Sequence, residues 1–186
     1  TLSDSPNHFF ALTMLGIIAA QSGESAEAEA FFGRAVQANP HNALAHTNFG
    51  NALLQSDKPE EALRSHDRAI AINPGYAEAH NNRGQALQKL GHVDAAIESF
   101  NRSIKIRADY AEAYNNLGSA LLLKKRPDDA LKNFDKAISI NPDYAEAHCN
   151  RGNALCDLGL FAKAIASYGR TLALQPSHAD AYNNRG

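Results

Sequence analysis

Cysteine is scarce in this sequence, with only Cys149 and Cys156 among 186 residues. Two thiols are too few for a disulfide framework. They stand seven residues apart on one predicted helix, about 10 Å along its axis, whereas a disulfide requires Cα atoms within ~7 Å. We therefore expect two reduced thiols in a reducing compartment, and hence a cytoplasmic protein.

The sequence also lacks an excess of basic charge and a long hydrophobic run. Its formal net charge is −2, so no basic surface that would attract nucleic acid is indicated. The longest apolar stretch covers residues 11–20 and is interrupted by Thr13 and Gly16, which makes it too short to cross a bilayer. We expect neither a nucleic-acid partner nor a membrane span. No export signal is visible, but the chain begins at Thr1 and not at methionine, so removal of a leader peptide stays an open alternative.

Motifs that carry catalytic or metal chemistry are missing as well. The eight histidines are scattered, and neither His-Glu-x-x-His nor paired Cys-x-x-Cys occurs. His80 and His148 stand 68 residues apart, too far to share a metal ion, so structural histidines are favoured. The chain is therefore expected to have no catalytic residue, no metal and no cofactor, and not to be an enzyme by itself.

What the sequence does contain is a period of 34 residues, at which glycine, proline and alanine each recur. A fixed period of this length indicates an array of small repeats that share a continuous core. The residues in phase are Gly16, Gly50, Gly84, Gly118, Gly152 and Gly186, with Pro6, Pro40, Pro74, Pro142 and Pro176, and with Ala28, Ala62, Ala96, Ala130 and Ala164.

The repeats account for the whole chain, which we expect to be a single array over residues 1–186. Residues 1–8 match the end of a preceding repeat, and residues 179–186 begin a partial sixth repeat. Both ends therefore look like cuts inside a longer array. Counted from Phe9, the five complete repeats are 9–42, 43–76, 77–110, 111–144 and 145–178.

Each repeat is predicted to form two helices joined by a short turn. In the fourth repeat, apolar residues at helical spacing place these helices over residues 111–124 and 127–140. The turn is expected in two forms. Three repeats place Gly23, Gly91 and Gly159 there, which suits a left-handed residue at a helix end. The other two start the second helix with Pro59 and Pro127, where a missing N–H costs nothing.

The recurring glycine stands in the middle of the first helix. Glycine there costs ~1 kcal/mol relative to alanine, so packing must offset the cost. We expect the missing side chain to let the first helix approach the row of alanines on the second helix.

These residues resemble the tetratricopeptide repeat. The resemblance rests on Tyr114-x2-Leu117-Gly118-x2-Leu121, followed by Ala130-x3-Phe134-x2-Ala137 and Pro142, and it extends over nearly the whole chain. Departures include His66 at the aromatic position and Ala108 at the proline position. The resemblance implies an all-α fold, a right-handed α-solenoid of tandem helix–turn–helix repeats, with the first helices lining its concave face.

A row of asparagines, two residues before each glycine, is the candidate peptide-binding site. An asparagine side chain offers two donors and an acceptor, and can pair with the N–H and C=O of an extended peptide. The row resembles the asparagine ladder of the O-GlcNAc transferase superhelix, which implies peptide binding. The alternative is that these side chains tie neighbouring helices together. The candidates are Asn48, Asn82, Asn116, Asn150 and Asn184, with Asn81 and Asn115 beside two of them.

Two charged rows also follow the period. We expect the acidic row to stabilise helix dipoles rather than to attract a basic ligand, and the basic row to face solvent. No lysine stands at the expected concave positions, so a carboxylate clamp for chaperone C-termini is not expected. The acidic row is Glu78, Glu112, Glu146 and Asp180, and the basic row is Arg34, Arg68, Arg102, Lys136 and Arg170.

We therefore expect a non-catalytic scaffold for protein–protein interaction that binds an extended peptide or a partner protein in the concave groove. Two alternatives stay open. The array could be the substrate-recognition arm of a larger glycosyltransferase similar to O-GlcNAc transferase, without activity of its own. It could also associate end to end with further copies, since its terminal repeats lack a polar capping helix.

Overall fold

The computed structural model of the protein describes residues 6–185. The regular elements among these residues are all α-helices, and they follow one another at the period that the sequence predicts. The chain forms two compact units, Thr1–His92 and Val93–Gly186. Their boundary falls in the turn between the two helices of the third repeat. One continuous array across that boundary therefore stays a prediction.

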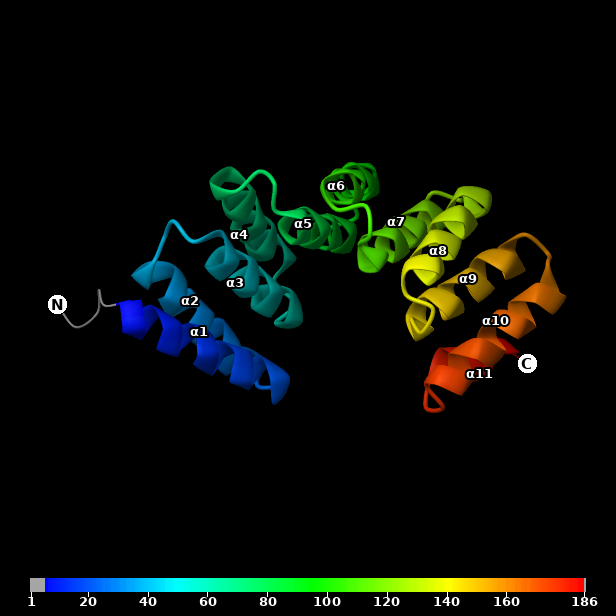
Figure 1. Cartoon of the computed structure of the whole chain (residues 1–186), viewed down its shortest axis with the longest axis horizontal. Coiled ribbons are helices and arrows are strands. Elements are labelled where there is room, and N and C mark those ends of the chain that lie inside the picture. The colour runs from blue at the N-terminus through cyan, green and yellow to red at the C-terminus, as the bar shows by residue number, and fades with distance from the viewer. Residues whose placement is uncertain (1–5, 186) are drawn as a thin grey trace. The chain divides into compact units, whose positions relative to one another are not determined.

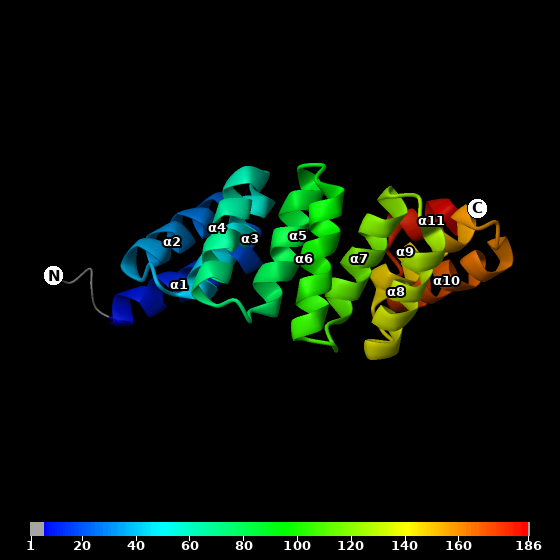
Figure 2. The same ribbon diagram turned by 90° about the horizontal axis from the view of Figure 1, so that it is seen from above.

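The first unit contains two complete helix pairs and the first helix of a third pair (Figures 1 and 2). Helix α1 packs against α2 and α3 against α4, while α2 and α4 also pack against the first helix of the following repeat. The bounds are α1 (Pro6–Gln21), α2 (Ser25–Ala38), α3 (Ala43–Gln55), α4 (Pro59–Ile72) and α5 (Ala77–Lys89).

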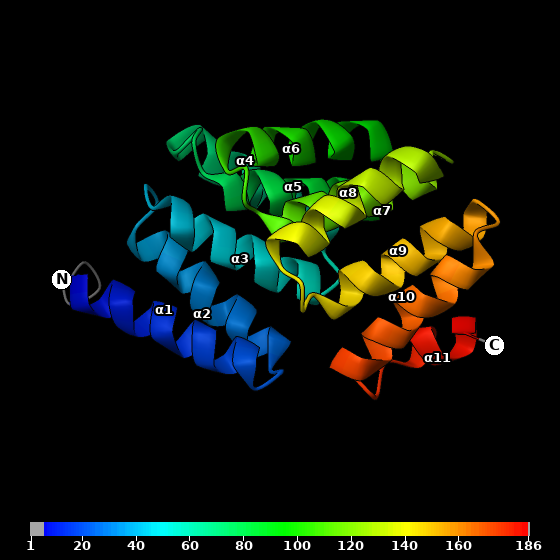
Figure 3. The same ribbon diagram turned by 45° about the vertical axis from the view of Figure 1, so that its right-hand side comes forward.

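The second unit continues the same succession, starting from the second helix of the third repeat. Each helix packs against the next one along the chain, and α7 also contacts α9. Figure 3 shows α9, α10 and α11 side by side. The bounds are α6 (Val93–Ile106), α7 (Ala111–Leu123), α8 (Pro127–Ile140), α9 (Ala145–Asp157), α10 (Phe161–Leu174) and α11 (Ala179–Arg185).

Prolines determine several helix ends. Helices α4 and α8 begin at Pro59 and Pro127, as predicted, because the first turn of a helix does not use the N–H that proline lacks. The first helix of the fourth repeat ends at Leu123, one residue before its predicted bound. The pattern of prolines and apolar residues therefore located this helix pair closely.

The turn inside each repeat has one left-handed residue in all five repeats. Asp57 has φ 56° and Lys125 has φ 58°, close to the φ of 78°, 79° and 72° at Gly23, Gly91 and Gly159. After α7, the N–H of Lys125 donates to Leu122 O at 2.9 Å, and that of Arg126 donates to Leu121 O at 3.0 Å, which is a Schellman ending. The prediction of two different turns is wrong, because proline at the start of the second helix does not replace the left-handed residue.

The mid-helix glycines pack against rings, and not against the alanine row as predicted. A Cβ on Gly118 would come 2.5 Å from Cε1 of Phe134, and one on Gly16 would come 2.7 Å from the ring of Phe32. His66 and Tyr168 lie against Gly50 and Gly152 in the same way. The ring occupies the space that a Cβ would fill, so only glycine leaves room for it at this position.

Recurring histidines fix the connection between one repeat and the next. Nε2 of His46 lies 3.0 Å from the carbonyl oxygen of Pro40, and Nε2 of His148 lies 2.9 Å from that of Pro142. His80 has the same contact with Pro74, at 3.1 Å. A carbonyl only accepts, so Nε2 carries the proton and donates. This arrangement agrees with the structural role predicted for the histidines.

Candidate functional site

The asparagine row lies on the first helices of successive repeats. Asn48 is on α3 and Asn82 on α5 in the first unit, while Asn116, Asn150 and Asn184 are on α7, α9 and α11 in the second. Asn82 is buried, Asn184 is exposed, and the other three are half-buried. The row therefore lies largely in the seams between helices, where its amides can reach a neighbouring helix.

Three members of the row donate a hydrogen bond to the preceding first helix. Asn82 Nδ2 donates to Asn51 Oδ1 at 2.7 Å, and Asn184 Nδ2 donates to Asn153 Oδ1 at 3.0 Å. Asn150 Nδ2 lies 3.4 Å from Ser119 Oγ. Each of these partners precedes its asparagine by 31 residues. The bonds are those that a helix-tying role requires, while peptide contact stays a prediction.

The two flanking candidates are inside the helix packing. The side chains of Asn81 and Asn115 belong to fully buried residues. Asn81 Nδ2 donates to Asn82 Oδ1 at 3.1 Å, and Asn115 Nδ2 donates to Glu146 Oε1 at 3.2 Å. Oδ1 of Asn115 also accepts from Asn150 at 3.0 Å. A peptide could reach these two amides only if the helices opened, so their predicted ligand contact stays a prediction.

Asn48 differs from the other members of the row. The residue 31 positions before it is Ile17, a hydrocarbon side chain that cannot accept a hydrogen bond. Within the part of the chain that the structure describes, the Asn48 amide has no hydrogen-bond partner among the side-chain contacts. It is also half-buried, so this amide is partly removed from water without a protein partner.

The Asn48 side chain lines a cavity of about 300 Å³, which we name the α1–α3 pocket. Side-chain amides and apolar groups line it together, and none of its lining residues is ionisable. The sequence singled out only Asn48 among these residues, because the others come from three different helices. The lining residues are Ile17, Ala20 and Gln21 of α1, Phe32 of α2, and Asn48, Asn51, Ala52 and Gln55 of α3.

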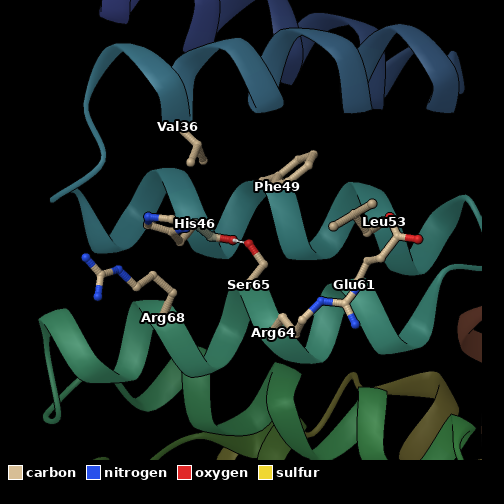
Figure 4. Close-up of a pocket in the computed structure, with 8 residues that line it drawn as sticks. All are labelled: Val36, His46, Phe49, Leu53, Glu61, Arg64, Ser65 and Arg68. Atoms are coloured by element: carbon tan, nitrogen blue, oxygen red, sulfur yellow. Dashed lines mark hydrogen bonds between the residues drawn. The ribbon is translucent and has the colours of Figure 1, made fainter.

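A second cavity, of about 330 Å³, lies between α2, α3 and α4 (Figure 4). Its apolar wall is Val36, Phe49 and Leu53, and its charged residues are Glu61, Arg64 and Arg68. The Ser65 hydroxyl donates to the carbonyl oxygen of His46 at 2.9 Å across it. No single helix carries a pattern that would have revealed this cavity. These charged side chains distinguish it from the α1–α3 pocket, which has none.

The charged rows lie where the sequence places them. Glu78, Glu112 and Glu146 are in the first turns of α5, α7 and α9, the position at which a carboxylate stabilises a helix dipole. The side chain of Asp180 lies outside the described part. The basic row is exposed, as expected, at Arg34, Arg68, Arg102, Lys136 and Arg170.

Three further features of the described residues concern metal ions, thiols and membranes. Among them, no group of three or more histidine, cysteine or acidic side chains is arranged to hold a metal ion. Cys149 is buried, Cys156 is half-buried, and both are free thiols. None of the described helices combines the length and the apolar composition that crossing a membrane requires.

Sequence models of one repeat family match most of the chain. A model described as "Tetratricopeptide repeat" matches residues 111–144 and 145–178, which coincide with the fourth and fifth predicted repeats. Another of that description matches residues 19–65, and one described as "TPR repeat" matches residues 50–91 and 89–125. No curated protein sequence matches the chain.

Solved structures show the same fold. A thermophilic TPR protein from Thermus thermophilus has a TM-score of 0.85 and 19% identity, over 95% of this chain and 96% of that one. MamA has a TM-score of 0.71 and 24% identity, over 92% and 93% of the two chains. YrrB, described as a TPR protein with an unusual peptide-binding site, has a TM-score of 0.67 and 22% identity, over 90% and 87%.

These similarities confirm the predicted fold class, an all-α α-solenoid type built from tandem helix–turn–helix repeats. At such identities they establish the fold alone. The finer resemblance to the repeats of O-GlcNAc transferase is not established by them and stays a prediction.

Proposed function

Because the chain belongs to the tetratricopeptide repeat family, we propose that it is a non-catalytic scaffold that binds an extended segment of a partner protein along its first helices. The family and the related folds support the interaction scaffold. The peptide-binding site in the description of YrrB supports the finer proposal, since that protein has the same fold. A cytoplasmic setting belongs to the proposal and is supported by the two free cysteines.

The observation that carries the proposal is the succession of side-chain amides on first helices that contact one another. Helix α3 contacts α5 in the first unit, and α7 contacts α9 in the second. An amide side chain can accept from a peptide N–H and donate to a peptide C=O. Amides repeated along neighbouring helices therefore suit an extended backbone, with little regard to its sequence.

Tying helices together does not prevent a member of the row from binding a peptide. Asn150 acts as the donor in both of its hydrogen bonds, to Asn115 and to Ser119. Its carbonyl oxygen accepts no hydrogen bond among the described residues. A peptide N–H could therefore pair with Asn150 while the helix–helix bonds remain.

The amides alone support only weak binding. One net hydrogen bond contributes ~0.5–1.5 kcal/mol, so three would contribute about 1.5–4.5 kcal/mol. Micromolar affinity needs about 8 kcal/mol, and additional contacts must supply the remainder. Removing three amides should still weaken binding at least tenfold, because a factor of ten corresponds to about 1.4 kcal/mol.

The test compares two triple variants of the full chain. Peptides are selected from a random displayed library on the unchanged protein, and their affinities are measured by calorimetry. We expect Asn82→Ala, Asn116→Ala and Asn150→Ala together to weaken binding at least tenfold. The matched control, Arg102→Ala, Lys136→Ala and Arg170→Ala, changes the same three repeats at exposed positions and should stay within twofold. Equal affinity for both variants, with both folded by circular dichroism, would contradict the proposal.

A second candidate function, self-association, is favoured by one face of α1. Three exposed hydrophobic residues stand four positions apart on this helix. They are Phe10, Met14 and Ile18, which are 63%, 55% and 55% exposed. Ala52, which is in phase with Ile18 one repeat later, is buried in a cluster with Ala28 and Phe32 of α2. A helix from a second copy could cover the α1 face in the way that α2 covers α3.

Light scattering over a hundredfold range of concentration tests this second function. Association through α1 should raise the average mass with concentration. Met14→Asn combined with Ile18→Ala, which introduces the residues of the later repeats, should hold the mass at that of one chain. A monomer mass at every concentration for the unchanged protein would count against self-association. No structural observation specifically favours a glycosyltransferase arm, which stays a prediction.

A further inference from the structure

We propose that the α1–α3 pocket receives one uncharged aliphatic side chain of the bound peptide, whose backbone pairs with the amide of Asn48. The proposal deepens the proposed function and rests on it. At Asn48, an amide without a side-chain partner lines a cavity.

The amide pair found at the next junction is incomplete at the pocket. At the next pair of first helices in the same unit, Asn51 of α3 accepts from Asn82 of α5 at 2.7 Å. Between α1 and α3, the residue in phase with Asn51 is Ile17. Isoleucine cannot complete that bond, so the amide of Asn48 is left facing the cavity that it lines.

The lining defines the class of side chain that fits. Phe32 and Ala52 are 4% and 2% exposed, and with Ile17 and Ala20 they form the apolar part of the pocket. Burying a charged group against them would be unfavourable, because no lining residue could neutralise it. An aliphatic side chain, in contrast, would gain by leaving water.

The amides of the lining define how the peptide is held. Gln21, Asn51 and Gln55 surround the pocket together with Asn48, and amides can both donate to and accept from a peptide backbone. A volume of about 300 Å³ is at the lower end of ligand pockets, which begin at ~300 Å³. This size suits one side chain with its adjoining backbone better than a whole small molecule.

Capped pentapeptides with glycine at every position except the third provide the probe. The third residue is leucine, glycine, glutamate or lysine. Binding to the full, isotopically labelled chain is followed through the side-chain amide signals of Asn48, Asn51, Asn116 and Asn150 and the methyl signals of Ile17. We expect saturable shifts at Asn48 and Ile17 with the leucine peptide at millimolar concentration. The apparent Kd should be at least fivefold higher for the other three peptides.

Three substitutions locate the binding. Ile17→Asn introduces the amide that closes the next junction, and should weaken leucine-peptide binding at least tenfold. Ile17→Val keeps the hydrocarbon wall and should stay within threefold. Ala20→Leu fills the cavity with the residue found in phase one repeat later, Leu54, and should also block binding. This last variant keeps the test decisive where Ile17→Asn fails to fold.

Any one of three results would overturn the pocket assignment alone. The first is equal binding of the glycine and leucine peptides. The second is leucine-peptide binding that shifts Asn116 and Asn150 but not Asn48. The third is leucine-peptide binding that survives both Ile17→Asn and Ala20→Leu. In these cases the proposed peptide-binding function would stand. Absence of shifts at every first-helix amide, together with no peptide selected from the displayed library, would instead remove the pocket and the proposed function together.

Discussion

The imidazole ring of His66 lies against Gly50, in the space that a Cβ on that glycine would occupy. In three other repeats the ring that lies against the glycine belongs to Phe32, Phe134 or Tyr168. His66 is fully buried, and neither of its ring nitrogens has a hydrogen-bond partner among the described residues. Burial therefore lowers the pKa of His66 from 6.5 to about 4.

This histidine should make the first unit sensitive to mild acid. Between pH 6.5 and about 4, the unfolded chain binds a proton at His66 that the folded chain does not bind, so stability falls as the pH falls. Above pH 6.5 the contribution is constant. We expect His66 to cost about 2 kcal/mol of unfolding free energy between pH 7 and pH 5. Urea titrations at the two pH values measure the loss.

The matched variant is His66→Phe, which introduces the ring that lies against Gly16 and Gly118. It removes the titrating group and two unpaired nitrogens, so the variant should be more stable than the unchanged chain at pH 7. Between pH 7 and pH 5, the variant should lose about 2 kcal/mol less unfolding free energy than the unchanged chain. An equal loss in both proteins would show that other groups cause the pH dependence.

Glycine to alanine should have opposite effects at two positions of the second unit. Gly169 lies within α10, and a Cβ added there would have nothing within 4 Å, so Gly169→Ala should stabilise by ~0.5–1 kcal/mol through helix propensity. Gly118→Ala would force a methyl group against Phe134 and should destabilise by ~1–3 kcal/mol. Thermal and chemical denaturation of the two variants compare them directly. Stabilisation by Gly118→Ala would contradict the proposed ring packing.

The left-handed residue after α7 offers a separate test of the turn. Lys125 has φ 58°, a conformation that costs a non-glycine residue ~1–2 kcal/mol. Lys125→Gly should therefore raise the unfolding free energy by about 1 kcal/mol. The reverse change, Gly159→Ala at φ 72°, should lower it by a similar amount. The same sign for both changes in chemical denaturation would refute the common turn geometry.

Alanine substitutions in the asparagine row should separate the bonded amides from Asn48. Asn150→Ala removes two hydrogen bonds and leaves the buried Asn115 oxygen without its donor, so we expect a loss of ~1–3 kcal/mol. Asn48→Ala removes no bond and should change stability by less than ~0.5 kcal/mol. Equal losses in urea titrations would mean that Asn48 also ties helices together.

Prolines and the 34-residue period made the helices predictable, because both act through the local backbone. Proline removes an N–H and restricts φ whatever lies around it, so the starts of α4 and α8 at Pro59 and Pro127 could be predicted from sequence. The turn residues Asp57 and Lys125 were missed, because lysine does not favour the left-handed conformation and aspartate adopts it only occasionally.

Relationships between helices were harder to predict. The period shows that a glycine and a ring recur together at the positions of Gly50 and His66, but the rotation of each helix decides whether the glycine faces that ring or an alanine. The bond between Asn82 and Asn51 likewise depends on two helices being adjacent and correctly rotated. The residue pattern of a single helix does not show how far its side chains lie from those of another helix. The sequence therefore could not decide whether the row binds a peptide or ties helices together.

At the junctions α3–α5, α7–α9 and α9–α11, a hydrogen bond joins two side chains that stand 31 residues apart in the sequence. Two amides bond across a junction at Asn51 and Asn82, whereas Ile17 offers Asn48 no such bond, and both line a cavity. Single substitutions can therefore change one junction at a time. Asn51→Ile should remove the acceptor of Asn82 between α3 and α5. An engineer could in this way choose which junctions of an array offer an unpaired amide to a ligand.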